Sequence, residues 1–217
     1  MIVENILRLK EEIPKEVKLI AISKTKPTSD IIKAYNSGHI YFGENKIQEM
    51  GIKFEKLPKD IKWHMVGHVQ SNKIKYMASY VDLVHGIDSL KSLKVLNKEG
   101  EKNKRVINCL LQLKLSDEDS KFGLDEKKFK EIIYSSDYDE MKFVKIKGLM
   151  GMASFTNDQK KIENEFKFGY KIYSAIKKND QNIDILSMGM SNDYKLAIKC
   201  GSNMIRIGSI IFGERNY

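Results

Sequence analysis

Eight short apolar runs, rich in β-branched residues, recur along the 217-residue chain with helical patterns between them. The runs are continuously apolar rather than alternating, which is typical of parallel strands covered on both faces. Eight such strands in a chain of this length favour a closed (β/α)8 TIM-type barrel of the α/β class. An open doubly wound sheet is the alternative, but no G-x-G-x-x-G sequence follows the first run. We expect strands at residues 19–23, 40–44, 63–69, 83–87, 106–115, 146–153, 185–190 and 204–212.

The N-terminal residues 2–12 form an amphipathic segment, with Ile2, Ile6 and Leu9 on one face. Few residues follow the last predicted strand, so we expect this additional N-terminal helix to cover the gap that a missing eighth helix would leave. Further helices are expected after Thr28 or Ser29, after Ser89 and over residues 158–178, together with a short helix that Ser191 and Asp193 open. The prediction is a single barrel domain, residues 1–217, with no C-terminal β domain.

The composition points to an ordinary soluble protein, with 41% hydrophobic and 31% charged residues. The sequence has neither an apolar run of about 18 residues nor the apolar core of a signal peptide, so we expect a cytoplasmic protein without a membrane partner. The net charge of +9 comes from lysine more than arginine, since four of the 38 basic residues are arginines. Base-reading surfaces favour the arginine fork, so no specific nucleic-acid partner is expected.

The last two predicted strands carry features of a phosphate site. Arg206 stands alone among aliphatic residues, and a guanidinium buried there needs a polar partner. Phosphates in barrels often bind at the loops after strands seven and eight, where Ser191, Gly208 and Ser209 lie. Ser191 would head a helix there, so its hydroxyl and the following N–H groups suit an oxyanion. Two simpler interpretations remain open: Ser191 as an ordinary N-cap and Arg206 as the partner of a carboxylate.

Lys24 leaves the first predicted strand at the end where barrel active sites lie. An isolated lysine is most often a surface residue. A lysine at a barrel mouth in apolar surroundings, however, has a depressed pKa and can form a Schiff base. A lysine facing a phosphate site suggests pyridoxal 5′-phosphate (PLP), with Arg206 directed to the pyridine nitrogen of the cofactor.

Other polar residues at predicted strand ends are candidates for the lining of the same pocket. Asn45 closes the second strand and His68 ends the third. His64 and His68 have the spacing of a helical metal pair, but four residues of strand span about 13 Å, too far for one zinc ion. We therefore predict no metal site and interpret His64 as a core residue.

Seven segments together resemble one known family over nearly the whole length of the chain. The chain is similar to the pyridoxal phosphate homeostasis proteins, the YggS/PROSC family, and the eleven residues at 63–73 are the most specific match. The segments are residues 21–27 (AISKTKP), 42–49 (FGENKIQE), 63–73 (WHMVGHVQSNK), 120–124 (SKFGL), 147–150 (KGLM), 186–191 (LSMGMS) and 205–212 (IRIGSIIF). Lys46 departs from the family pattern, where an aromatic residue is commoner, and so does the Gly-Met-Ala sequence at 151–153.

The resemblance implies a PLP-binding barrel like the N-terminal domain of alanine racemase, with Lys24 as the Schiff-base lysine. It places Ser191, Arg206, Gly208 and Ser209 around the cofactor. It also implies a protein that buffers and delivers PLP and maintains vitamin B6 and amino-acid pools, without a well-defined reaction, so we assign no catalytic residue. PLP-dependent apo-enzymes are the expected recipients and a monomer the expected state. The alternative is a PLP-dependent amino-acid racemase of the same fold, which needs a second acid–base group that we cannot assign.

Overall fold

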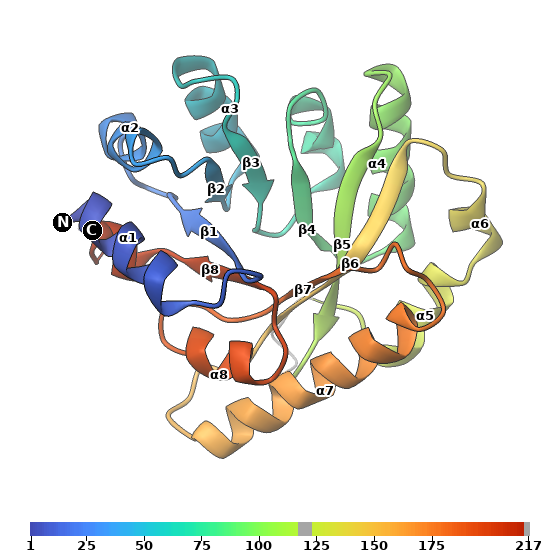
Figure 1. Cartoon of the computed structure of the whole chain (residues 1–217). Helices are drawn as coiled ribbons and strands as arrows, with labels where there is room; N and C mark the ends of the chain where they lie inside the picture. The colour runs from blue at the N-terminus through green and yellow to red at the C-terminus, as the bar shows by residue number, and fades with distance from the viewer. Residues whose placement is uncertain (117–122, 215–217) are drawn as a thin grey trace.

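The computed structural model describes residues 1–116 and 123–214, and its eight strands close into one parallel barrel in the order β1-β2-β3-β4-β5-β6-β7-β8 (Figure 1). The closure is made by β1, which pairs in parallel with both β2 and β8. The strands are β1 Lys18–Ile22, β2 Tyr41–Glu44, β3 Lys62–Met65, β4 Leu83–Ile87, β5 Ile107–Lys114, β6 Val144–Met152, β7 Ile185–Ser187 and β8 Met204–Ile207. The predicted (β/α)8 barrel is therefore confirmed.

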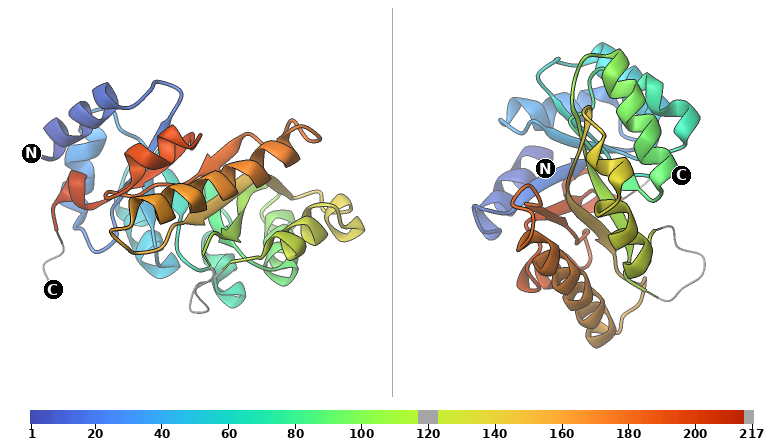
Figure 2. Two further views of the ribbon diagram at one scale, coloured as in Figure 1. Left: turned by 90° about the horizontal axis from the view of Figure 1, so that it is seen from below. Right: turned by 90° about the vertical axis from the view of Figure 1, so that its right-hand side faces the viewer.

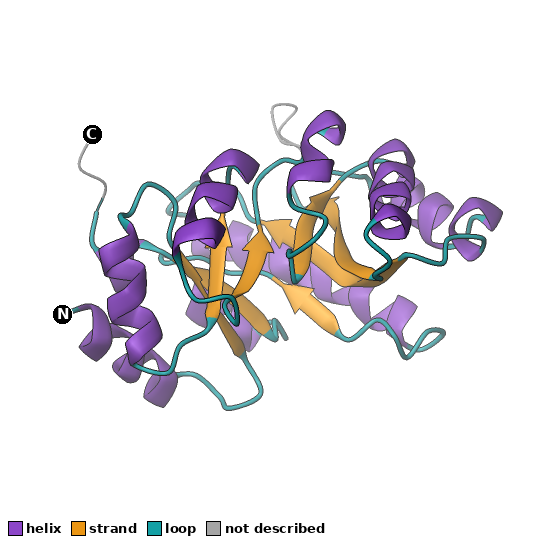
Figure 3. Cartoon of the chain, turned by 90° about the horizontal axis from the view of Figure 1, so that it is seen from above, coloured by secondary structure: helices purple, strands orange, loops and turns teal. Residues whose placement is uncertain are grey.

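Helices surround the strands on the outside of the barrel (Figure 3). Their apolar faces form a continuous core with the outer faces of the strands, because the longer helices are amphipathic and bury one stripe. The helices are α1 Ile2–Glu12, α2 Thr28–Asn36, α3 Ile47–Lys56, η1 Ser71–Tyr76 (a 3-10 helix), α4 Leu90–Lys102, α5 Glu126–Ile133, α6 Ser136–Asp139, α7 Gln159–Lys177, α8 Tyr194–Lys199 and α9 Ser209–Phe212. Figure 2 shows the long helix α7 lying across the outside of the barrel.

The N-terminal helix α1 takes the place expected of it. Ile6 and Leu9 are buried, and the helix packs against α2 and α9. Its Asn5 side chain donates a hydrogen bond to the carbonyl of Ile211 in α9, at 3.2 Å. The helix therefore closes the side of the barrel next to β8, where α9 is four residues long.

Several predicted boundaries are wrong. The eighth strand ends at Ile207, and Ser209–Phe212 is the helix α9, because hydrogen bonds from Ile211 and Phe212 back to Gly208 turn the chain. The third strand ends at Met65 and the seventh at Ser187, so the residues that follow both are loops. Apolar residues in buried loops satisfy the same pattern as strand residues, which is why the runs read as longer strands.

Candidate functional site

A cavity of about 820 Å³ lies at the carboxyl ends of the barrel strands. This size is within the range of about 300–1,000 Å³ found for small-molecule and cofactor sites. Loops after β1, β2, β3, β6, β7 and β8 contribute to its wall. The sequence-predicted residues come together here: the lining includes Lys24, Asn45, His68, Ser191, Arg206, Gly208 and Ser209.

The lysine and the predicted phosphate residues lie on neighbouring strands. Lys24 is half-buried two residues beyond β1, and β1 pairs with β8 so that Ile20 lies opposite Arg206. Gly208, just after β8, approaches the end of β1 closely, since a Cβ at this position would lie 3.3 Å from the carbonyl oxygen of Ile22. Barrel closure therefore joins two segments that are about 180 residues apart in the chain.

Arg206 is buried, with 5% of its surface exposed. Its NH1 donates to the carbonyl and the hydroxyl of Ser187, both at 2.8 Å, and its NH2 donates to the carbonyl of Gly151 at 3.1 Å. Within residues 1–116 and 123–214, no carboxylate accepts a hydrogen bond from this guanidinium, so the expected carboxylate alternative is not observed there. Burial lowers the pKa of Arg206 to about 10, against the nearby charge of Asp193, and the group stays charged at neutral pH.

A chain of buried polar groups runs from Arg206 through the barrel interior. The hydroxyl of Ser187 lies 3.2 Å from His85 Nδ1, and His85 Nε2 lies 2.9 Å from His64 Nδ1. Since Arg206 can only donate, Ser187 is left to donate to His85, and His85 Nε2 then donates to His64 Nδ1. His64 Nε2 ends the chain 3.6 Å from Asp82 Oδ2. Burial lowers the pKa of both histidines, which are therefore neutral.

The loop after β7 differs from the prediction. Asp193, not Ser191, is the N-cap residue of α8, and Ser191 lies in the loop two residues earlier. The Ser191 hydroxyl instead accepts a hydrogen bond from the Gly208 N–H at 3.4 Å, which links the loops after β7 and β8. Asp193 holds the loop by accepting from the Met190 N–H at 2.6 Å, and burial raises the pKa of its carboxyl.

Asn45 and His68 reach the cavity from the β2 and β3 loops. These loops touch at Gly67, where a Cβ would lie 2.3 Å from the Asn45 carbonyl oxygen, so a glycine is required. The His68 side chain is exposed, with its Nδ1 3.2 Å from Asp88 Oδ2. His64 is buried on β3 beside His85, and the described residues contain no cluster of three or more His, Cys, Asp or Glu side chains suited to a metal ion.

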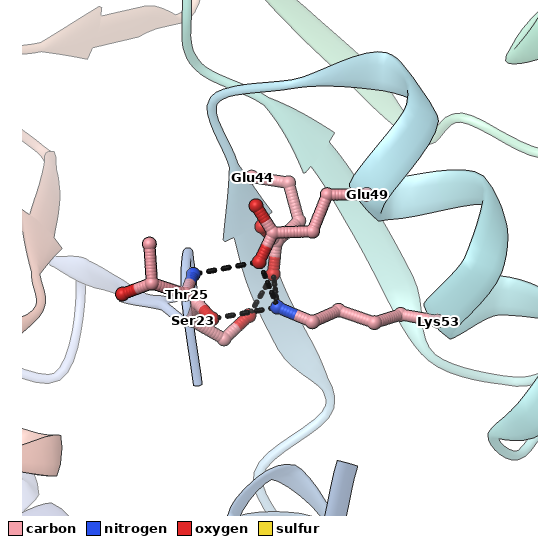
Figure 4. A network of polar contacts seen from close by, with 5 residues as sticks. All are labelled: Ser23, Thr25, Glu44, Glu49 and Lys53. Atoms are coloured by element: carbon pink, nitrogen blue, oxygen red, sulfur yellow. Dashed lines mark hydrogen bonds and ion pairs between the residues drawn. The ribbon is translucent and has the colours of Figure 1, made fainter. Parts of the chain in front are cut away.

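The structure adds residues that the sequence reasoning missed. Buried Gln112 and the loop at residues 154–157 also line the cavity. Glu165 in α7 holds this loop, since its carboxylate accepts from both the N–H and the hydroxyl of Ser154 at 2.6 Å. A charged cluster around Lys53 lies beside the Lys24 segment (Figure 4). The only signal for it was a buried strand that ends in Glu44.

Comparison with known proteins agrees with this geometry. The model of the family described as "Alanine racemase, N-terminal domain" matches residues 1–216. The chain belongs to this family. Among curated proteins, it is 39% identical to the pyridoxal phosphate homeostasis protein of Haemophilus influenzae over 207 residues, which are 93% of this chain and 86% of that protein. It is 34% identical over 211 residues to the protein of the same name from Escherichia coli K12, covering 94% of this chain and 88% of the relative.

Solved structures show the same fold. PipY of Synechococcus elongatus, in the structure with PLP bound, matches with a TM-score of 0.89 and 30% identity, covering 98% of this chain and all of that one. The alanine racemase of Clostridium difficile matches with a TM-score of 0.77 and 14% identity, over 57% of its own length. At that identity the second match shows the fold alone. The predicted family resemblance and the predicted barrel are thus both confirmed.

Proposed function

We propose that this chain binds PLP as a Schiff base on Lys24 and buffers and delivers the cofactor, which maintains vitamin B6 and amino-acid pools. One observation supports this most strongly: a buried, charged Arg206 with neutral partners lines the same cavity as Lys24. A buried cation without a carboxylate partner leaves an anionic or electron-rich ligand atom favoured beside it. The names of the relatives and the PLP-bound neighbour support the same cofactor.

The lining residues fit PLP chemically. The cofactor needs an amine for its aldehyde, donors for its phosphate and a partner for its ring nitrogen. Lys24 offers the amine, while Ser191, Gly208 and Ser209 offer hydroxyl and backbone donors on adjoining loops. Arg206 is assigned to the ring nitrogen, and Asn45 and His68 to the wall of the pocket. When bound, PLP supplies a reactive aldehyde that can bond to the amine of another molecule in place of the lysine amine.

The residues that line the cavity favour binding of the cofactor over catalysis of a reaction. A racemase needs acid–base groups on two faces of its substrate. Among the described residues, none of the tyrosines lines the cavity, and Arg206 keeps a ring nitrogen unprotonated, which weakens the cofactor as an electron sink.

We propose no catalytic residue, PLP-dependent apo-enzymes as recipients, and a monomer that works as one domain over residues 1–217. Gel filtration tests the monomer, and a stable dimer would contradict it. Within the described residues, no helix has the length and apolar character needed to span a membrane.

The test is borohydride reduction of the protein loaded with PLP, followed by peptide mapping of the pyridoxyl adduct. We expect the adduct on Lys24 and none in Lys24→Ala, which should fold normally. The matched control is Lys26→Ala on the same loop, whose ammonium donates to the carbonyl oxygens of Phe212 and Glu214 at 3.0 Å. This control should keep the adduct. An adduct that persists in Lys24→Ala would overturn the assignment.

A further inference from the structure

A buried cluster of charges lies against the segment that carries Lys24 (Figure 4). At its centre is Lys53 of α3, whose side chain is 6% exposed. Its ammonium contacts Glu44 Oε1 at 2.8 Å and Glu49 Oε1 at 2.7 Å. Glu44 is fully buried at the end of β2 and also accepts from the hydroxyl of Ser23 at 2.6 Å.

The cluster holds the peptide groups on both sides of Lys24. On one side, the Lys53 ammonium donates to the carbonyl oxygen of Ser23 at 2.8 Å. On the other, the Thr25 N–H donates to Glu49 Oε1 at 2.6 Å, the same oxygen that contacts Lys53. One ion pair therefore fixes the backbone before and after Lys24.

The backbone at Thr25 needs such support. Its φ is +65°, in the left-handed region that costs a non-glycine residue about 1–2 kcal/mol. Strained residues of this kind persist where surrounding contacts over-determine them. Here the contact is the Glu49 carboxylate, which Lys53 in turn holds in place.

Stability alone is a poor explanation for the cluster. Buried ion pairs are often no more stabilising than apolar side chains of similar volume. An apolar replacement, however, would offer no bond to either peptide group beside Lys24. We propose that Lys53, Glu44 and Glu49 form a positioning unit that directs the Lys24 side chain into the cavity. This inference rests on the proposed function, in which Lys24 reacts with PLP.

The test compares Glu49→Ala and Glu49→Gln with a matched control, Glu163→Ala in α7. Both glutamates contact a lysine four residues later at 2.7 Å, and their side chains are 26% and 29% exposed. PLP is added, and the rate of Schiff-base formation on Lys24 is followed by its absorbance and by borohydride trapping. The pH at which the Schiff-base absorbance changes by half is measured as well, since a loss of folded protein alone would not move this midpoint.

We expect Glu49→Ala to slow adduct formation about tenfold, because small displacements of a reacting group cost this much or more. Its pH midpoint should shift too. Glu49→Gln keeps an oxygen for the Thr25 N–H and should recover part of the rate, while Glu163→Ala should match the wild type. Equal rates and midpoints in Glu49→Ala and Glu163→Ala would overturn the positioning role. Absence of an adduct in the wild type would instead overturn the proposed function.

Discussion

Two buried cations, Arg206 in the cavity wall and Lys53 behind the Lys24 segment, have different kinds of partner. Lys53, beside β1 and β2, meets two carboxylates. Arg206, on β8, donates to the oxygens of Ser187 and to the Gly151 carbonyl, all of which are neutral. Both side chains are about equally buried, at 5% exposure for each residue.

The difference indicates what each charge is for. Desolvating a cation costs several kcal/mol, which close carboxylates or well-directed dipoles can offset. The Lys53 charge is neutralised by two carboxylates of the protein, and the ammonium fixes the neighbouring backbone. Arg206 is held in place by dipoles, and its charge remains available to a ligand in the cavity. Four predictions test this comparison, from the largest expected effect to the smallest.

Replacing Lys53 with methionine should cost about 3–5 kcal/mol of unfolding free energy, because it leaves the buried Glu44 carboxylate without its cation. Urea denaturation measures the loss. The control is Lys167→Met, which removes the exposed partner of Glu163 at 2.7 Å and should leave the unfolding free energy nearly unchanged. Similar losses in the two variants would show that the Lys53 charge is not compensated as described.

Lowering the pH should weaken the protein through its buried histidines. Burial lowers the pKa of His39 from 6.5 to about 4, so the proton binds the unfolded chain more tightly. Stability is then full above pH 6.5 and falls as the pH drops to about 4, by about 3 kcal/mol for this group. His64 and His85 act in the same direction on the Arg206 side.

Glu44 should act in the opposite direction, because burial raises its pKa and its protonation favours the folded state. Lowering the pH therefore destabilises the fold through the buried histidines and stabilises it through Glu44. Urea denaturation at several pH values, with NMR titration of the histidines, checks both signs. A His39 resonance that titrates near pH 6.5 in the folded protein would contradict the prediction.

Replacing Arg206 with methionine should cost about 2–3 kcal/mol, less than Lys53→Met, because neutral carbonyl groups are left unsatisfied rather than a charge. The same substitution should also weaken cofactor binding. We expect PLP affinity to fall at least about tenfold, the equivalent of one hydrogen bond to a charged group. Titration of the cofactor by absorbance measures it. Unchanged affinity would make Arg206 purely structural.

The smallest effects should come from one fully buried serine in each region. Ser23→Ala removes a 2.6 Å hydrogen bond to the Glu44 carboxylate and should cost about 1.5 kcal/mol. Ser187→Ala should cost about 1 kcal/mol, since the Ser187 carbonyl still accepts from Arg206 and the bond lost to the neutral His85 is a longer one, at 3.2 Å. Denaturation of the two variants side by side tests this order. A larger loss of unfolding free energy in Ser187→Ala would show that the stronger hydrogen bonds lie around Arg206 and not around Lys53.

The candidate site was largely predictable because of barrel geometry. In a parallel barrel all strands end at one face, so polar residues at strand ends must meet there. This is why Lys24 and Arg206, chosen on separate segments, line one cavity. The capping role of Ser191 was wrong, since Asp193 two residues later stands at the N-cap position of the same helix. Neighbouring residues with similar capping propensity cannot be separated by local pattern.

Other parts of the site had no local signal. On an amphipathic helix Lys53 has the pattern of a surface lysine, and it becomes buried only because α3 packs beside the end of β1. His85 had no suggestive neighbours in the sequence, yet it joins His64 and Ser187, which come from other strands. Contacts of this kind depend on which side chains the closed barrel brings together.

The sequence by itself determined the strand count, the barrel, the N-terminal helix and the end of the barrel where the site lies, because hydrophobic periodicity and parallel topology are local and geometric constraints. The tertiary structure alone decided which buried charges are compensated. A charge is buried or exposed, paired or unpaired, according to atoms that the chain supplies from distant positions. Glu44 reaches Lys53 across nine residues, whereas Ser187 reaches Arg206 across 19 and Gly151 across 55.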